Sequence, residues 1–363
     1  MPELKIVERA LHHNVRLVRR VAGDAEVVGV VKGNGYGLGL LEFAGHLVDY
    51  GVRRLAVSEL SEALELKKYG IQADIMLLTP VYDSGELELA IQADLILCID
   101  SRPCAQAAER AARRLERTGR GQLCVDTGFG RYGFSWDQAG EVCEAARELE
   151  QIRIVGTYSH LSRAGARDGS YTQTQYQRFL SLCGALEQAG IDPGFRHLAD
   201  SYGLLRHPEL RLDGVRVGSA FLGRLPFPDQ WGFERIGTLS APVKEIRTLG
   251  AGSTVGYGGE YVTERTTRIA VIGAGYSHGF GLGREKSAAC TGGLRGVLRM
   301  LRTPRQNEPV LAAAGERRFP VLGPVGMCAT VLDVTGSDLQ VGDWVELPVN
   351  PLFVNSDVPR CYI

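Results

Sequence analysis

The chain has 363 residues, of which 44% are hydrophobic, with 41 Lys and Arg against 42 Asp and Glu. This length can bury an ample core, and the near-zero net charge gives no reason to expect nucleic acid or an anionic membrane as a partner. No apolar run approaches the ~20 residues of a membrane span, and the start, MPELKIVERALHHNV, lacks a signal-peptide core. We therefore expect a cytoplasmic protein that binds a small neutral or zwitterionic molecule.

Short apolar segments alternate with amphipathic helical segments from residue 26 to about residue 220. The predicted strands cover residues 26–31, 54–58, 74–80, 95–100, 122–127, 152–160, 195–200 and 214–219. Between them, apolar residues recur at helical spacing in 40–51, 59–70, 103–119 and 173–190. Repeated strand–helix units predict a parallel sheet, and eight continuously apolar strands favour an α/β fold of the (β/α)8 TIM-barrel type over residues 1–230.

The pattern changes after about residue 230. Strand-like segments follow with few helical ones, at 237–249, 253–262, 266–274, 319–325, 328–336 and 343–349. They predict a mostly β domain over residues 231–363. Residues 282–309 depart from this pattern and carry several arginines, so we expect a long basic surface insertion there.

The eight cysteines are scattered along the chain without a Cys-x-x-Cys pair. This spacing argues against zinc sites and against a disulfide framework. We expect most of them to be small buried side chains, and we expect no metal in the site.

Polar residues stand where the predicted strands end. Functional groups of a (β/α)8 barrel lie at the C-terminal ends of its strands, so these side chains should converge on one mouth. They come from the first, fifth, sixth, seventh and eighth strands, and they are Lys32, Arg131, His160, Ser201 and Arg216.

Lys32 lies between an apolar strand and the glycine-rich segment 33–39, GNGYGLG. A lysine in apolar surroundings loses hydration of its ammonium form, so its pKa falls and its neutral amine can form a Schiff base with an aldehyde. Groups suited to a phosphate are the hydroxyl and N–H donors of Ser201, Gly218 and Ser219, and Tyr36 adds a hydroxyl four residues after Lys32. An amine beside a phosphate site indicates pyridoxal phosphate as the cofactor.

The segment VVKGNGYGLG resembles the pyridoxal-phosphate lysine motif of the alanine racemase family. Seven further segments resemble the family's successive motifs in the same order, so the resemblance covers nearly the whole chain. These segments are VDTGFGRYG, GTYSHL, HLADS, VRVGSAFLG, GAGSTVGYGGEYV, GAGYSHG and GPVGMCATVLDVTG. It implies an N-terminal barrel, a C-terminal β domain and a pyridoxal-phosphate-dependent racemase of alanine or a related, larger or polar amino acid.

The resemblance also implies roles for individual residues. Lys32 corresponds to the lysine that binds the cofactor and serves as one of two catalytic bases. Tyr257 corresponds to the second base, which the partner subunit of a homodimer contributes. Arg216 corresponds to the arginine that faces the pyridine nitrogen, with His160 beside it. The remaining matches are phosphate contacts at Tyr36, Ser201, Gly218 and Ser219, and groups that hold the substrate carboxylate at Arg131 and the backbone of Met327.

Three positions depart from the family pattern. Cys124 replaces a lysine that steadies the carboxylate-binding arginine, Cys328 replaces an aspartate, and Ser356 falls near a tyrosine that narrows the pocket. Loss of an aromatic side chain removes well over ~100 Å² of contacting surface. We therefore expect a roomier pocket that admits serine or a longer neutral or basic amino acid as well as alanine.

Two alternatives remain open from the sequence. A decarboxylase, or another enzyme that cleaves a bond at Cα, can be built on the same two domains; Cys328 favours it and Arg216 disfavours it. A non-catalytic pyridoxal-phosphate-binding protein is the other alternative. The β domain and its Tyr257 disfavour that function, because carriers with this barrel typically lack the second base.

Overall fold

The computed structural model describes residues 1–225, 227–282 and 310–363. These residues form two compact units, Arg9–Ile236 and a second unit of Met1–Glu8 with Gly237–Ile363. The basic insertion expected at 282–309 lies outside the described residues except for Leu282.

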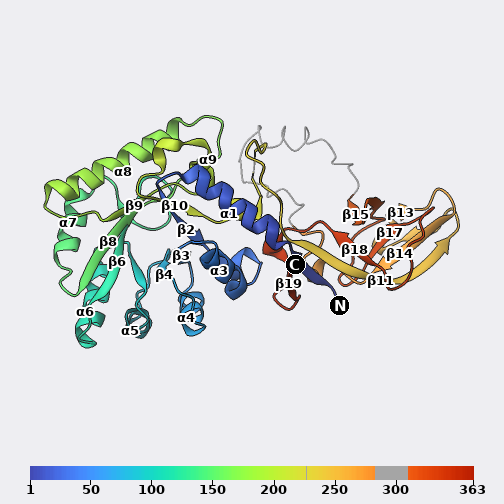
Figure 1. Ribbon diagram of the computed structural model, residues 1–363, viewed down its shortest axis with the longest axis horizontal. Helices are drawn as coiled ribbons and strands as arrows, with labels where there is room; N and C mark the ends of the chain where they lie inside the picture. Colours follow the sequence, from blue (N-terminus) through green and yellow to red (C-terminus); the bar gives the residue numbers. More distant parts are fainter. Residues whose placement is uncertain (226, 283–309) are drawn as a thin grey trace. The chain divides into compact units, whose positions relative to one another are not determined.

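In its described residues, the unit Arg9–Ile236 is a closed barrel of eight parallel strands with helices around it (Figure 1). The strands pair in the order β5-β4-β3-β2-β10-β9-β8-β6, and pairing of β5 with β6 closes the ring. Their bounds are β2 (Glu26–Val30), β3 (Arg54–Val57), β4 (Asp74–Leu77), β5 (Ile96–Ile99), β6 (Gly119–Asp126), β8 (Ile152–Tyr158), β9 (Phe195–His197) and β10 (Gly214–Val217). The predicted TIM-type barrel is confirmed.

The longer barrel helices each bury one apolar face. In α1 (Glu8–Ala22), buried Leu11, Val15 and Val18 recur at three and four positions, which places them on one face. The side chain of Asp83 accepts the N–H of Glu86 and so caps α5. The other helices are α2 (Lys32–Tyr36), α3 (Leu40–Asp49), α4 (Leu60–Lys68), α5 (Ser84–Gln92), α6 (Arg102–Arg114), α7 (Ala139–Arg147), α8 (Ser170–Gln188) and α9 (Ser201–Arg206).

The barrel interior is packed with side chains rather than open. An apolar cluster joins residues of neighbouring strands, namely Val28, Val30, Ala56, Met76 and Ile96. A second cluster of Cys98, Cys124 and Tyr158 lies next to it. The Cys98 Sγ lies 3.1 Å from the Tyr158 hydroxyl, which donates to the carbonyl of Leu78 at 3.2 Å. These side chains therefore fill the interior of the barrel.

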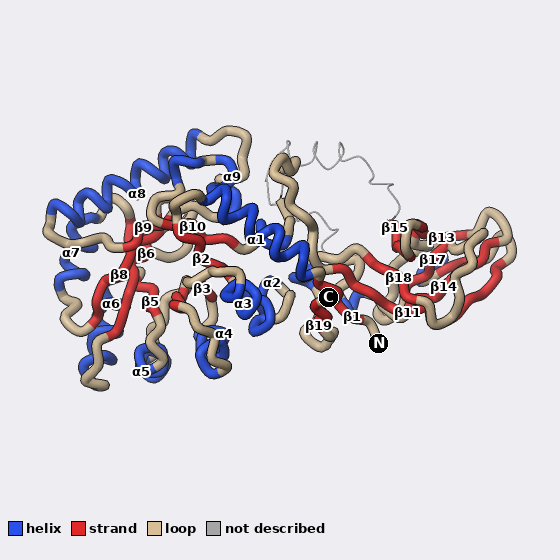
Figure 2. Tube along the Cα trace, viewed as in Figure 1, coloured by secondary structure: helices blue, strands red, loops and turns tan. Residues whose placement is uncertain are grey.

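The second unit is mostly β, as predicted (Figure 2). Its main sheet has the order β16-β15-β18-β11-β1-β19, and β14 pairs with both β11 and β17. β1 (Glu3–Ile6) lies between β11 and β19. The sequence-based prediction assigns this N-terminal segment to the barrel, as part of residues 1–230. The other bounds are β11 (Thr238–Leu249), β12 (Thr254–Val255), β13 (Tyr261–Val262), β14 (Thr267–Ile272), β15 (Leu311–Ala314), β16 (Arg317–Pro320), β17 (Thr330–Asp333), β18 (Trp344–Leu347) and β19 (Arg360–Tyr362).

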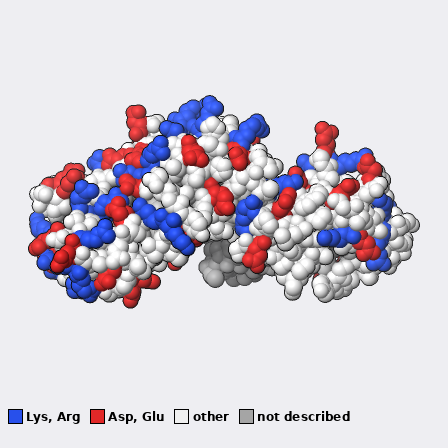
Figure 3. Space-filling model, turned by 60° about the horizontal axis from the view of Figure 1, so that its bottom comes forward, with Lys and Arg blue, Asp and Glu red and all other residues white. Residues whose placement is uncertain are grey.

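Surface charge is mixed in sign. On the face shown in Figure 3, basic and acidic side chains are interspersed. Within the described residues, no helix combines the length and apolar character that crossing a bilayer requires. The same residues contain no group of three or more His, Cys, Asp or Glu side chains that could hold a metal ion.

Candidate active site

The predicted polar residues of the barrel unit gather at the C-terminal ends of its strands. Lys32 follows β2, Arg131 lies in the segment after β6, and His160 follows β8. Ser201 begins α9 after β9, and Arg216 lies within β10. The positive charges of Arg131 and Arg216 act on both Lys32 and His160, so the structure brings these groups together at one mouth.

The segment after Lys32 forms a left-handed turn. Gly33, Asn34 and Gly35 have φ values of 64°, 54° and 62°, and Tyr36 has φ of 55°. The N–H of Gly35 bonds the carbonyl of Val31 at 2.9 Å. This conformation costs about 1 to 2 kcal/mol for a residue with a Cβ, and glycine escapes that cost. The glycines that follow Lys32 therefore make possible a tight turn that carries the lysine.

Lys32 is half-buried at the start of this turn. Burial lowers the pKa of its amine, and the charges of Arg131 and Arg216 lower it further. The charge of Glu62 acts in the opposite direction. Lys32 therefore loses its proton to form the neutral amine more readily than a lysine in water does.

Tyr36 and Ser201 both lie close to Gly218. The Ser201 hydroxyl accepts the backbone N–H groups of Gly218 at 3.2 Å and Ala220 at 3.3 Å. A Cβ on Gly218 would lie 2.4 Å from the Tyr36 hydroxyl, so only glycine fits there. Burial raises the pKa of Tyr36 to about 12, which keeps the hydroxyl protonated as a donor. Ser219 follows directly and begins a short 3-10 helix.

Arg216 is buried and bonded to two histidines. Its Nη1 donates to His197 Nδ1 at 2.8 Å, and its Nη2 lies 3.4 Å from His160 Nδ1. Its Nη2 also donates to the carbonyl of Ser159 at 2.6 Å. The Arg216 Nε has no hydrogen-bond partner in the described part of the chain, so this N–H is available to an acceptor that enters the mouth.

Both histidines are neutral in this environment. Burial, followed by the charges of Arg216, Arg131 and Lys32, lowers the pKa of His160 to about 3. Burial and Arg216 also hold the pKa of His197 well below its ordinary value. His197 was not among the predicted site residues. A histidine in the middle of the predicted strand 195–200, just before the polar residues at its end, was the signal that could have indicated it.

Arg131 presents its guanidinium against aromatic rings. It lies 4.6 Å from the ring centroid of Phe129 and 5.7 Å from that of Tyr132. Across the described ranges, no carboxylate pairs with it. Cys124 is buried nearby, with its Sγ 3.6 Å from the Tyr132 carbonyl. Arg131 is therefore a cation without an anionic partner from the described residues.

Two of the predicted site residues belong to the β unit. Tyr257 begins the 3-10 helix η3 (Tyr257–Gly259), and 78% of its surface is exposed. The carbonyl of Met327 accepts the hydroxyl of Ser277 at 2.7 Å. Cys328 is exposed with its Sγ 3.5 Å from the same hydroxyl, and Ser356 is also exposed. The barrel unit taken alone therefore presents Lys32 without the predicted second base.

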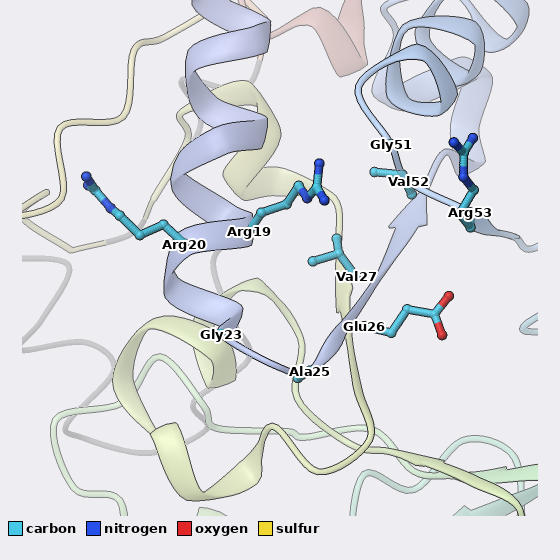
Figure 4. Close-up of a pocket in the computed structure, with 9 residues that line it drawn as sticks. All are labelled: Arg19, Arg20, Gly23, Ala25, Glu26, Val27, Gly51, Val52 and Arg53. Carbon is cyan, nitrogen blue, oxygen red and sulfur yellow. The ribbon is translucent and has the colours of Figure 1, made fainter.

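A separate groove of about 420 Å³ lies at the opposite end of the barrel (Figure 4). Its lining residues precede β2 and β3 or begin these strands, whereas Lys32 follows β2. In TIM barrels that end serves stability, and chemistry occurs at the C-terminal end. The groove is lined by Arg19, Arg20, Gly23, Ala25, Glu26, Val27, Gly51, Val52 and Arg53.

Comparison with known proteins identifies the family of the chain. The N-terminal domain of alanine racemase matches residues 6–226, and the C-terminal domain of alanine racemase matches residues 236–352. The alanine racemase of Thermobifida fusca is 33% identical over 347 residues, which are 94% of this chain and 86% of that protein. The alanine racemase of Clostridium tetani is 30% identical over 343 residues, which are 93% of this chain and 83% of that protein.

Solved structures are similar over the whole chain. The alanine racemase of D-cycloserine-producing Streptomyces lavendulae superposes with a TM-score of 0.85 at 28% identity, covering 100% of this chain and 97% of that one. The alanine racemase of Bartonella henselae, solved with covalently bound pyridoxal phosphate, shares the fold with a TM-score of 0.81 at 23% identity, covering 100% of this chain and 99% of that one. The matches span both units at once. The chain belongs to the alanine racemase family and is an amino-acid racemase, an isomerase.

Proposed function

We propose that this chain racemises alanine and related amino acids with pyridoxal phosphate, and that Lys32 and Tyr257 act as bases on opposite faces of the substrate Cα. The observation that carries this proposal is the placement of Lys32 at the barrel mouth. Its amine is half-buried on a left-handed turn, and its pKa is lowered by burial and by two arginines. Since racemisation removes a proton from one face and delivers one to the other, it needs two such groups.

The residues of the mouth fit pyridoxal phosphate. Tyr36, Ser201 and Ser219 carry hydroxyl groups that can donate to a phosphate, and Gly218 beside them lacks the Cβ that would collide with the Tyr36 hydroxyl. The unpartnered Nε of Arg216 suits a ring nitrogen. When bound, the cofactor draws electron density away from the substrate Cα and acidifies its proton.

Arg216 also favours racemisation over other reactions at Cα. A guanidinium keeps its proton, so it donates to a ring nitrogen without protonating it. By leaving the nitrogen unprotonated, Arg216 would favour return of the proton to the substrate Cα over slower competing reactions. Arg216 therefore disfavours the decarboxylase alternative.

Substrate binding needs a cation for the carboxylate. We assign this role to Arg131, which has no carboxylate partner in the described segments, together with the backbone N–H of Met327. With cysteine at position 124 and serine at position 356, we expect serine and longer amino acids to be turned over besides alanine. The preferred substrate is the amino acid that is racemised most efficiently in the experiment that follows.

The proposal is tested with both enantiomers of a panel of amino acids, including alanine, serine, lysine and arginine, in deuterated water. Both chirality and exchange of the Cα proton are measured. We expect Lys32→Ala to lose racemisation by about 1,000-fold or more, the scale of a general base. Tyr257→Phe should lose inversion but still exchange the Cα proton of one enantiomer. Matched controls are Lys68→Ala and Tyr69→Phe, which should keep full activity.

Sharing of sites between two copies is tested by mixing the variants. If Tyr257 of the partner subunit completes each site, co-expressed Lys32→Ala and Tyr257→Phe chains form mixed dimers in which one site has both native groups. Random pairing in a two-fold dimer should then restore about a quarter of the native activity. Mixtures that stay as inactive as the separate variants would show that the two bases come from one chain or that Tyr257 has another role.

A further inference from the structure

The left-handed turn after Lys32 is held by a carboxylate from another element. Glu62 lies in the first turn of α4, and its Oε1 accepts the backbone N–H of Asn34 at 3.0 Å. Asn34 is two residues after Lys32, in the middle of the turn. The side chain of Asn34 in turn accepts the N–H of Leu40 at 2.9 Å, which ties the end of the segment to the start of α3. Glu62 thus helps to fix the backbone that carries the lysine.

The second oxygen of Glu62 has no such partner. Its Oε2 is buried and makes no hydrogen bond with any described residue. Leaving a buried polar atom unpaired costs about 1 to 3 kcal/mol, more when the group is charged. A glutamine could accept the Asn34 N–H equally well, so the backbone bond alone does not explain the charge.

The charge of Glu62 acts on Lys32. The other groups that act on this lysine or respond to its charge are Arg131 after β6, Arg216 in β10 and the neutral His160 after β8. Both arginines disfavour the ammonium form, and Glu62 is the group that favours it. A lysine that both takes up and releases a proton must be able to adopt its ammonium and its neutral amine form near neutral pH.

We propose that Glu62 is a positioning residue for Lys32, in which one carboxylate oxygen holds the lysine's turn through Asn34 and the negative charge balances the two arginines at the mouth. The inference rests on the proposed function of Lys32 as a base. It assigns a role to a residue that does not itself touch the substrate.

The test compares variants that separate the two roles of Glu62. Glu62→Gln keeps an acceptor for Asn34 but removes the charge, Glu62→Asp keeps the charge on a shorter side chain, and Glu62→Ala removes both. Glu65→Gln, an exposed carboxylate on the same helix, is the matched control. Circular dichroism and thermal unfolding first identify which variants are folded.

The main readout does not depend on activity. In the full chain freed of cofactor, the rate at which trinitrobenzenesulfonate labels Lys32 is followed against pH by peptide mass spectrometry, because only the neutral amine reacts. We expect Glu62→Gln to reach half-maximal labelling at lower pH, with labelling near neutral pH at least about threefold faster, which corresponds to about half a pKa unit. Glu62→Asp and Glu65→Gln should follow the unchanged chain.

In the holoenzyme, the pH profile of alanine racemisation should move in the same direction. Its acidic limb shifts to lower pH in Glu62→Gln and stays in place in Glu65→Gln. Unchanged labelling and an unchanged profile in folded Glu62→Gln would overturn the proposal. The proposed function fails in a different way. In that case Lys32→Ala would still racemise amino acids, although the labelling of Lys32 would still change in Glu62→Gln.

Discussion

His160 is held neutral beside two arginines and a lysine. Its pKa falls from an ordinary value near 6.5 to about 3 in the folded chain. A group with a depressed folded pKa contributes stability that is fully present above the unfolded pKa and is lost as the pH falls toward the folded pKa. The window for His160 therefore runs from about pH 6.5 down to about pH 3.

We predict that this histidine makes the protein acid-sensitive. Each pH unit within the window lowers the free energy of unfolding by about 1.4 kcal/mol, so acidification from about pH 7 to about pH 5 should remove about 2 kcal/mol through His160. In His160→Gln that part of the loss should disappear. Urea titrations at the two pH values measure it, with the exposed His12→Gln as control. An equal loss in the native chain and in His160→Gln would contradict the assignment.

At the scale of elements, the turn that carries Lys32 requires glycine for two reasons. Gly35 has φ of 62°, and a Cβ there would lie 3.1 Å from the Cβ of Phe43 in α3. Gly45, within α3 itself, has open space around its Cα. The two glycines therefore respond differently to the same substitution.

We predict that Gly35→Ala destabilises the protein by about 1 to 2 kcal/mol, from the left-handed conformation alone. Gly45→Ala should stabilise it by about 0.5 to 1 kcal/mol, because alanine is the better helix former. Urea unfolding of both variants at one pH measures the difference. If Gly35→Ala were as stable as Gly45→Ala, the turn would not have the left-handed conformation described.

At the scale of the whole molecule, the two units are not simple halves of the chain. The N-terminal strand β1 pairs antiparallel with β11 and parallel with β19, so the first and last strands meet in one sheet. Leu4 and Ile6 are fully buried there, whereas Lys5 lies between them on the other face and contacts Glu3 at 3.7 Å. The stability of the β unit therefore depends on residues that precede the barrel.

We predict that Ile6→Ala lowers the free energy of unfolding of the β unit by about 2 to 5 kcal/mol, the usual cost of such a core truncation. Limited proteolysis should then cut within Gly237–Ile363 before it cuts within Arg9–Ile236. Lys5→Ala, whose surface ion pair contributes little, should leave the cleavage pattern unchanged. Equal sensitivity of both units in Ile6→Ala would show that β1 stabilises them together.

Much of the barrel could be predicted because its strands are buried on both faces and read as continuous apolar runs. The prediction of residues 26–31 corresponds to β2 at Glu26–Val30, and 214–219 to β10 at Gly214–Val217. β1 and β19 could not be assigned in the same way. Each forms a strand because it pairs with a segment distant in the chain, and its own composition does not indicate that pairing.

By itself, the sequence determined the barrel, the β domain, the family and a lysine after the first barrel strand, because these depend on apolar periodicity and on motifs contiguous in the chain. Only the tertiary structure decided that residues 33–36 form a left-handed turn, that Arg216 also bonds His197, and that Glu62 bonds that turn. The physical reason is that each of these features depends on contacts between elements separated in sequence, or on the burial and charge that such contacts create.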